Sequence, residues 1–441
     1  MAERDRDGLA RRALELAGGE TEVIVEERDL ALTRFTHNAV HQNLAIDERT
    51  IRIRTIVDGR TGVVSTGDGS DGGLATAIAR ARNIAALAPY DPVAIGLRRS
   101  APAVPAGPDA YDAPTAATSP DARAAAARAI FAVCERDGLW AAGYVSTARS
   151  GITIANTRGT FATHDGTTCA VNVKANGPDA SGYAEYVGNA FGPCDPAAIA
   201  ETAAGKARLG AAPRAVEPGA WTVVLEPAAA GELASYLDGH FSARAYEEGS
   251  SFLSGDGDVR IGTLSLAEDH AHPLLHAMPF DYEGEPTRRV ALVEAGRTGP
   301  VVTDAAYARR LGRPNTGHAL PEPNAQGPQV RTTAIAAGDT SDADLIAGIE
   351  RGLLVSRFWY IRPVDRRRTI VTGMTRDGTF LIEHGRVTGG VKNMRFNQSI
   401  VAALGRARFG DREVRSGGYH YTTVAPMIAI EGFDFTSATA F

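Results

Sequence analysis

The sequence predicts an α+β protein with a layered N-terminal domain built on a β-meander and a β-rich C-terminal domain. Apolar residues alternate with polar ones over much of the chain, which is the period of a half-buried strand. Spacings of three and four residues, typical of helices, occur in a few separate segments. Many strand-like stretches follow one another in the C-terminal half, which indicates an antiparallel sheet, partly closed into a barrel. The length agrees with two domains, because 441 residues are too many for one hydrophobic core of ordinary size.

The N-terminal part begins with a short amphipathic helix. It covers residues 5–17 and ends at two glycines, which commonly terminate helices. Over residues 21–66 the apolar period changes to two, in five stretches separated by polar or Gly-containing turns. This pattern predicts a β-meander. A helix over residues 74–87 can cover one face of that sheet and stops before Pro89.

Proline marks the next segment. Seven prolines fall within residues 89–120, which predicts a connector or surface loop. Ser119 then caps a helix that runs to Arg136. Four predicted strands cover residues 141–146, 151–156, 161–164 and 168–174, and a helix covers 196–209. We place a domain boundary near residue 215, which gives domains 1–215 and 216–441.

The C-terminal part opens with a β-branched strand over residues 221–225, followed by a helix over Ala228–Asp238. A long irregular region rich in Gly, Asp and His covers residues 247–285. Further strands are predicted over residues 289–294, 299–303, 329–335, 353–361, 368–375, 379–383 and 386–391, with helices over 342–351 and 397–404.

Composition restricts the possible partners of the protein and its cellular compartment. The formal net charge of −6 gives no electrostatic reason to expect a nucleic-acid partner. The charged N-terminus lacks the apolar core of a secretory signal, and no apolar run is long enough to cross a bilayer. Three widely spaced cysteines show no pairing pattern, which fits a reducing compartment. We therefore expect a cytoplasmic protein that does not bind membranes.

The predicted helix over Ala228–Asp238 does not carry the ligands of a zinc peptidase. Such enzymes place two His on one helical face with a Glu after the first. Reading back five residues from His240 gives Ser235, followed by Tyr236. The frame His-Glu-x-x-x-His is therefore occupied as Ser-Tyr-Leu-Asp-Gly-His, and no catalytic residue is expected in it. Alone, His240 cannot hold zinc, so we expect a surface or hydrogen-bonded histidine at the helix end.

A second candidate is the cluster His270, His272 and His276, with several carboxylates nearby. Donors at this density could bind a metal adventitiously. The neighbouring prolines make the segment an irregular loop without a fixed face, so a structural or peptide-contacting loop is the alternative. No G-x-S-x-G nucleophile motif and no P-loop is present.

Six stretches together resemble the TldD/PmbA family. They run in the family's order over essentially the whole chain: RFTHNAVHQN, VVLEPAAAGEL, FDYEGEPTRR, NTGHALPEPNAQGPQVRTT, GLLVSRFWYI and FLIEHGRV. In that family the TldD type carries a His-Glu-x-x-x-His helix and a Cys near the C-terminus that completes a zinc site. It pairs with a TldE/PmbA type that lacks these ligands. Here Ser235 and Tyr236 replace the His and the Glu, and no Cys follows Cys194, so the chain is similar to the TldE/PmbA type.

The resemblance implies a zinc-deficient, non-catalytic subunit of a heterodimeric metallopeptidase that acts on unfolded or leader peptides. The expected partner is a TldD-type catalytic subunit that carries the zinc, and this chain is expected to hold no metal or cofactor. Its share would be to close the reaction chamber and hold the peptide. By resemblance the F-D-x-E-G loop adjoins the active-site region, so Phe280, Asp281, Glu283 and Gly284 are expected to shape the cleft.

Three adjacent aromatic residues, Phe358, Trp359 and Tyr360, give a further peptide-binding candidate. Strand edges bind extended peptides through backbone hydrogen bonds with little regard to sequence, and an aromatic strand could line such a cleft. On a strand the three side chains cannot all face one core, so at least one must point elsewhere. A buried second layer is the competing interpretation.

Two other hypotheses stay open. The chain could be a stand-alone homodimeric peptide-binding protein without hydrolytic activity. It could also be an active peptidase that uses a relocated metal site in the His270 loop.

Overall fold

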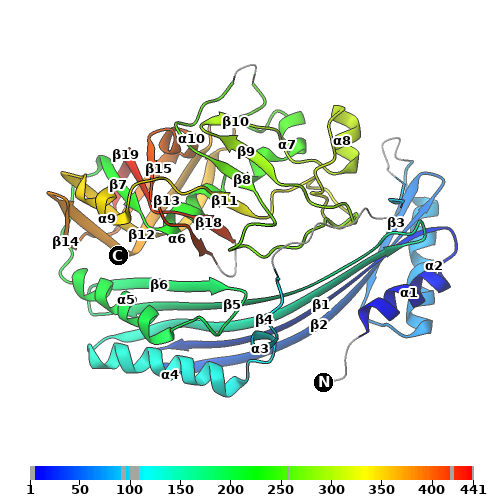
Figure 1. Cartoon of the computed structure of the whole chain (residues 1–441), viewed down its shortest axis with the longest axis horizontal. Helices are drawn as coiled ribbons and strands as arrows, with labels where there is room; N and C mark the ends of the chain where they lie inside the picture. Colours follow the sequence, from blue (N-terminus) through cyan, green and yellow to red (C-terminus); the bar gives the residue numbers. More distant parts are fainter. Residues whose placement is uncertain (1–4, 91–95, 100–108, 256–257, 418–421, 440–441) are drawn as a thin grey trace.

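A computed structural model describes residues 5–90, 96–99, 109–255, 258–417 and 422–439. A long curved sheet lies beneath a more compact C-terminal region that contains two further sheets (Figure 1). The predicted α+β class with a partly closed sheet is confirmed. No helix in these ranges is long and apolar enough to cross a membrane.

The first sheet is antiparallel throughout and has the order β3-β2-β1-β4-β5-β6. Its strands are β1 (Glu20–Thr36), β2 (Ala39–Val57), β3 (Arg60–Thr66), β4 (Trp140–Asn156), β5 (Phe161–Asn176) and β6 (Ser181–Gly188). The predicted meander is present, but its five stretches form three strands. Polar residues that suggested a turn, Arg28 and Asp29, pair with Glu48 and Asp47 in an unbroken ladder. The long strands therefore continue through polar segments where pattern alone indicated a break.

The breaks predicted between the strands 141–146 and 151–156, and between 161–164 and 168–174, are wrong for the same reason. The residues at these two breaks lie opposite each other and continue β4 and β5. Arg6 crosses Gly151 and donates two hydrogen bonds to the Asp165 carboxylate, at 2.8 and 2.7 Å. Gly151 leaves room for this contact, because a side chain there would displace the Arg6 guanidinium. Strand β6 was not predicted.

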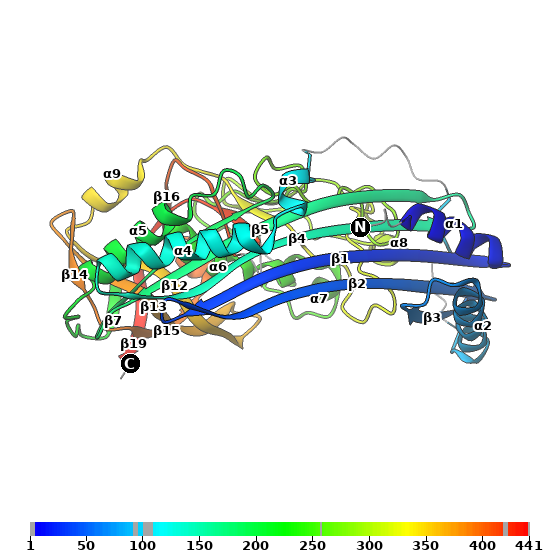
Figure 2. The same cartoon turned by 90° about the horizontal axis from the view of Figure 1, so that it is seen from below.

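Helices cover the sheet in two groups. They are α1 (Arg6–Leu16), α2 (Asp71–Leu87), α4 (Pro120–Arg136) and α5 (Pro196–Leu209). Figure 2 shows α1 and α2 at one end of the sheet, with α4 and α5 at the other. Each predicted helix is confirmed within a few residues, and the expected Ser119 cap accepts a hydrogen bond from the Ala122 amide.

The proline-rich connector is only partly a surface loop. Residues 91–95 and 100–108 lie outside the described residues. In the described part, Leu97 and Ala110 are buried and a short helix, α3 (Ala113–Ala116), is present. The Arg98 carbonyl accepts hydrogen bonds from side chains of the first sheet. The connector therefore contributes buried contacts that its composition did not indicate.

The second sheet has the order β10-β9-β8-β11-β18-β17. Its strands are short: β8 (Leu266–Glu268), β9 (Val290–Glu294), β10 (Arg297–Thr298), β11 (Thr333–Ile335), β17 (Val414–Ser416) and β18 (Thr423–Ala425). The parallel pair β11 and β18 brings distant segments together. The predicted strand over residues 299–303 is wrong; β10 ends at Thr298, and an unpredicted helix, α8 (Ala305–Leu311), follows.

The third sheet closes on itself. Its strands are β7 (Gly219–Leu225), β12 (Arg351–Asp365), β13 (Ile370–Glu383), β14 (Arg386–Gly390), β15 (Met394–Ser399), β16 (Ala407–Phe409) and β19 (Ile428–Ala438). Because β12 pairs with both β7 and β13, the path β12-β7-β19-β15-β13 forms a ring. The predicted helix over residues 397–404 is half strand, since residues 394–399 form β15 and only α10 (Ile400–Leu404) is helical. The predicted helix over 342–351 ends earlier, as α9 (Asp342–Ala347).

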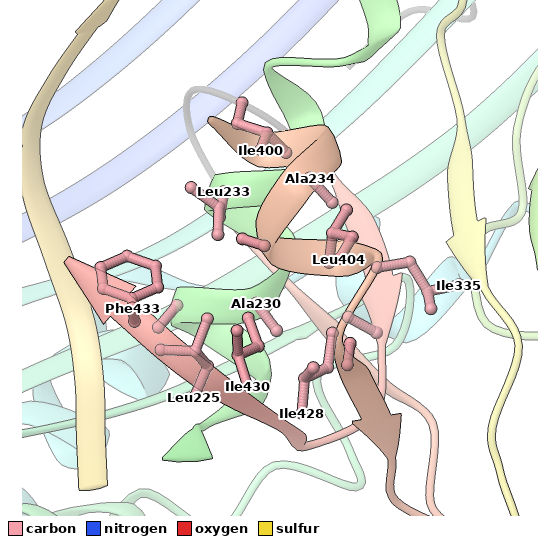
Figure 3. Packing of buried hydrophobic residues seen from close by; sticks show 14 of the residues in the cluster. Leu225, Ala230, Leu233, Ala234, Ile335, Ile400, Leu404, Ile428, Ile430 and Phe433 are labelled. Atoms are coloured by element: carbon pink, nitrogen blue, oxygen red, sulfur yellow. The ribbon is translucent and has the colours of Figure 1, made fainter. Parts of the chain in front are cut away.

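The largest hydrophobic core lies in the C-terminal region. Helix α6 (Pro227–Ser235) buries Ala230 and Leu233 against Leu225, Ile430 and Phe433 of the closed sheet (Figure 3). Helix α10 packs beside them with Ile400 and Leu404. Small residues on α6 allow it to approach the strands closely, so its position and rotation are fixed by packing.

A buried ion pair lies within the first sheet. Glu22 of β1 and Arg54 of β2 are register partners, with 3.2 Å between Arg54 Nε and Glu22 Oε1. Both side chains are at most 10% exposed. Burial raises the pKa of Glu22, and the Arg54 charge opposes this effect. Removal of Arg54 would leave Glu22 as an uncompensated buried carboxylate.

We expect Arg54→Met to lower the free energy of unfolding by about 3 kcal/mol, measured by urea denaturation. Arg52→Met is the matched control, because Arg52 lies two residues away on the same strand and pairs with Glu26 at 3.4 Å in a more exposed setting. Its loss should stay below about 1 kcal/mol. Equal losses in the two variants would contradict this account of the pair.

Candidate functional site

The residues of the frame Ser235–His240 lie where helix α6 ends. The helix was predicted to reach Asp238 but stops at Ser235, and a 3₁₀ turn, η1 (Asp238–Phe241), follows. Ser235 Oγ donates to the Glu232 carbonyl at 2.8 Å. Tyr236 Oη donates to the Ile361 carbonyl of β12, also at 2.8 Å. Both side chains that replace possible metal-site residues are thus engaged in internal hydrogen bonds.

The expectation for His240 was wrong, because this residue is neither at the surface nor hydrogen-bonded through Nδ1. It is 6% exposed, and its Nδ1 has no hydrogen-bond partner in the part of the chain that the structure describes. Its ring lies 5.3 Å from the ring of Phe252. Burial, helped by the Arg366 charge, lowers the pKa of His240 to about 4. His240 is therefore neutral at physiological pH and packs as an aromatic residue.

A buried polar cluster lies next to the frame. Asp238 Oδ1 accepts a hydrogen bond from Thr333 Oγ1 at 2.7 Å. The neighbouring Glu268 accepts from the Thr332 amide and hydroxyl, and His318 Nε2 lies 3.5 Å from it. Burial raises the pKa of Asp238 to about 8. For Glu268 burial acts in the same direction, but donors from His318 and Thr332 lower its pKa overall.

The loop that contains Phe280, Asp281, Glu283 and Gly284 is a tightly organised turn. Asp281 Oδ1 accepts from the amides of Glu283 and Glu285, each at 2.9 Å, and Oδ2 accepts from Ala319 at 2.9 Å. Gly284 has a φ of +74°, which a side chain would disfavour. Asp281 is therefore occupied in shaping the loop.

Two other residues of this loop face inward. Phe280 is 1% exposed. Burial, together with the charges of Asp281 and Asp304, raises the pKa of the partly buried Glu283 well above its usual range. Tyr282 Oη donates to Glu26 of β1 at 3.1 Å, which joins the loop to the first sheet. The loop thus lies between the first sheet and the C-terminal region, and its peptide-binding role stays a prediction.

The three adjacent aromatic residues separate, as expected for a strand. Phe358 is 1% exposed and packs against Phe396 at 4.7 Å between ring centroids. Trp359 and Tyr360 are 42% and 61% exposed. A register shift between Trp359 and Arg362, with a φ of +60° at Tyr360, allows both to point away from the core. Only Trp359 and Tyr360 are therefore placed to contact a ligand.

The loop histidines do not gather. His270 is buried, and His272 Nε2 lies 3.2 Å from a carboxylate oxygen of Glu413. His276 has a φ of +50° and a partly buried ring. Among the described residues, no three His, Cys, Asp or Glu side chains are placed to hold a metal ion.

A cavity of about 730 Å³ lies between the first sheet and β13. It is lined by residues that the sequence did not single out, among them Lys174 of β5 and Arg376 and Asp377 of β13. Asp377 accepts a hydrogen bond from Ser181 Oγ at 2.8 Å, and Lys174 Nζ lies 3.8 Å from its carboxylate. The lining of this cavity comes from segments far apart in the sequence, so no local pattern indicated it.

Asp238 gives a pH-dependent prediction. In the folded protein its carboxyl keeps a proton up to about pH 8, whereas in the unfolded chain it would ionise near its ordinary value of 3.8. The folded state therefore binds the extra proton, and the free energy of unfolding falls as pH rises through this interval. Asp238→Asn keeps the acceptor for Thr333 but cannot ionise. We expect it to exceed the native protein in stability at pH 9 by at least about 1.4 kcal/mol, with little difference near pH 4.

Urea unfolding at both pH values measures this effect. Asp411→Asn is the control, because Asp411 is an exposed acidic residue whose removal changes net charge equally. If Asp238→Asn and Asp411→Asn show the same pH dependence, Asp238 is not the group that titrates.

Comparisons with known proteins agree with this fold. Family models described as PmbA/TldA metallopeptidase domain 1, central domain and C-terminal domain match residues 21–85, 109–210 and 218–437. A zinc metalloprotease TldD homolog from Saccharolobus solfataricus is 29% identical over 151 residues. That match spans 32% of this chain and 33% of the relative, so it covers about a third of each.

Solved structures show the same architecture over almost the full length. The crystal structure of TldE from Thermococcus kodakarensis gives a TM-score of 0.87 at 20% identity, covering 98% of this chain and 99% of the other. A candidate modulator of a DNA gyrase from Thermotoga maritima gives 0.85 at 17% identity, covering 98% and 100%. At these identities the likeness concerns the fold. Because the three family models together span most of the sequence, the chain belongs to the PmbA/TldD metallopeptidase family.

Proposed function

We propose that this chain is the zinc-deficient, TldE-type subunit of a heterodimeric TldD/TldE metallopeptidase that acts on unfolded peptides. The observation that carries the proposal is the state of the frame. Ser235 and Tyr236 occupy the positions of a metal-binding His and a general-base Glu, and both hydroxyls already donate to backbone carbonyls. The likeness to a protein named TldE supports the assignment at the level of the fold.

Amide hydrolysis by a metallopeptidase needs a cation with three protein ligands and an open position for water. Near the frame this chain offers the buried ring of His240, and in the described residues no three His, Cys, Asp or Glu side chains are placed to hold a metal ion. In our proposal the TldD-type partner supplies zinc, the general base and the activated water. This chain closes the chamber and holds the substrate.

The first sheet offers a surface for an extended peptide. In the described chain, residues 39–50 of β2 pair with β1 on one side only, because β3 pairs with β2 from Ile51 onward. Most of this stretch is exposed. An unpaired strand edge can accept another strand through backbone hydrogen bonds, which tolerate varied side chains. Strand β12 is paired on both sides only over Gly352–Val355. Farther along it pairs with β13 alone, and there the exposed side chains of Trp359 and Tyr360 could contact a peptide.

We also assign the protein to the cytoplasm. Its three cysteines are free, and Cys134 and Cys169 are buried thiols whose pKa is raised by burial, to about 11 and about 12. Unpaired, unreactive thiols of this kind suit a reducing compartment.

The heterodimer is tested by mixing this chain with a TldD-type protein and running gel filtration. We expect both to elute together as a complex larger than either alone, because in the proposal the zinc and the general base come from the partner. The mixture should cleave an unstructured peptide in a chelator-sensitive way. Failure to co-elute, together with a persistent self-dimer that binds peptide, would favour the homodimeric peptide-binding alternative.

Elemental analysis of the purified chain tests the relocated metal site. We expect less than stoichiometric zinc after dialysis, and no change in metal content on His270→Ala/His272→Ala, since these rings do not converge. Stoichiometric zinc that disappears in the double variant would mean that the loop is a metal centre.

A further inference from the structure

We propose that a pocket lined by arginines, at the end of the closed sheet, binds carboxylate groups of peptides. This inference deepens the proposed function and rests on it, because it names a substrate class for a peptide-holding subunit. The pocket has a volume of about 400 Å³. We call it the arginine pocket, and its lining comprises Phe252, Val259, Arg260, Arg367, Arg368, Thr369, Ser399, Val401, Ala402, Gly405 and Arg406.

The pocket lies where the hairpin between β12 and β13 meets α10. Figure 1 places α10 on the side of the C-terminal region that faces away from the first sheet. Thr369 Oγ1 and Ser399 Oγ lie 3.1 Å apart, and each accepts a hydrogen bond from an amide at the start of α10. These contacts fix the floor of the pocket.

The charge of the arginine pocket is unbalanced. Within the described chain, Arg260, Arg367 and Arg368 form no ion pair, and all three are exposed. Arg406 donates to the carbonyls of Glu431 and Gly432, at 2.8 and 3.0 Å, so backbone groups orient it without neutralising it. Four arginines therefore line one concave site in a chain whose net charge is −6.

Among the described residues, two nearby acids, Asp365 and Asp258, form no ion pair with these arginines. Asp365 accepts a hydrogen bond from the Arg368 amide, which uses its carboxylate to form the hairpin turn. Asp258 is 92% exposed and lies 3.9 Å from Arg297. The arginine pocket thus keeps free guanidinium donors, the groups that best match a carboxylate.

The size and walls of the pocket favour a peptide over a polyanion. Phe252, Val259 and Val401 supply an apolar wall. A volume of about 400 Å³ holds one or two side chains, which suits an acidic side chain or a chain terminus. A nucleic acid would bring many phosphates toward a protein of net negative charge, which opposes association over distance.

The pocket also adjoins the degenerate frame. The ring of Phe252 lies 5.3 Å from that of His240 and 5.9 Å from that of Phe241 in η1. The positive charge of the neighbouring Arg366 contributes to the low pKa of His240. A carboxylate held by the arginine pocket would therefore anchor a peptide beside the segment that carries the frame.

Fluorescence anisotropy tests the proposal with the full chain and labelled Gly/Ser peptides. One peptide carries Glu and an amidated end, a second carries Gln and a free C-terminal carboxylate, and a third carries Gln and an amidated end. We expect at least one of the first two to bind about tenfold more tightly than the third at low salt. Which of them does so distinguishes a side-chain carboxylate from a chain terminus.

The variant Arg260→Gln/Arg367→Gln should remove that preference, with about a tenfold loss of affinity for the preferred peptide. Arg28→Gln/Arg80→Gln is the control, because it removes two exposed positive charges elsewhere. Equal thermal melting of both variants would show that folding is intact.

The outcomes separate the two proposals. If all three peptides bind equally and the pocket variant has no effect, the arginine pocket does not recognise carboxylates, while peptide binding itself stands. If the control variant loses as much affinity as the pocket variant, the preference reflects total charge and the pocket is rejected. If no peptide binds, the peptide-holding role fails, and the arginine pocket with it.

Discussion

The packing of α6 against the closed third sheet determines what the frame Ser235–His240 can do. Ala230 and Leu233 set the rotation of the helix, since both are buried against the strands. With this rotation fixed, Tyr236 reaches the Ile361 carbonyl and His240 is directed toward Phe252. A cation site would need side chains that converge, whereas this arrangement directs them to separate neighbours. The segment thus has a structural role, and we propose that it has no catalytic one.

A second feature of the structure is a set of buried carboxyl groups in the C-terminal region. Asp238 and Glu283 are buried enough for their pKa to be raised, while Glu268 is kept charged by donors around it. Neutral and charged carboxyls therefore coexist in the C-terminal region. Tyr282 of the C-terminal region donates to Glu26 of the first sheet. Lys206 of α5 donates to Glu226 of the C-terminal region. These polar links hold the layers in a defined arrangement, which the proposed chamber-closing role would require.

Sequence pattern predicted the helices of the N-terminal part well, but the C-terminal helices and the strands only in part. Caps such as Ser119 and breakers such as Pro89 act locally, so α2 and α4 were placed within a few residues. Strand ends depend on distant partners, and a polar pair such as Arg28 and Asp29 continues a ladder when its neighbour supplies a match. The short strands β16 to β18 have too few residues to show a period.

The candidate site was similarly only partly visible in the sequence. The loss of ligands at Ser235 and Tyr236 could be read directly, but the burial of His240 depends on Phe252, and the arginine pocket joins residues more than a hundred positions apart.

The central claim is that this chain has no hydrolytic site of its own. The most direct test is a peptide-cleavage assay on the isolated chain, with and without a chelator and free of contaminating enzyme. We expect no cleavage in either condition; chelator-sensitive cleavage would contradict the claim.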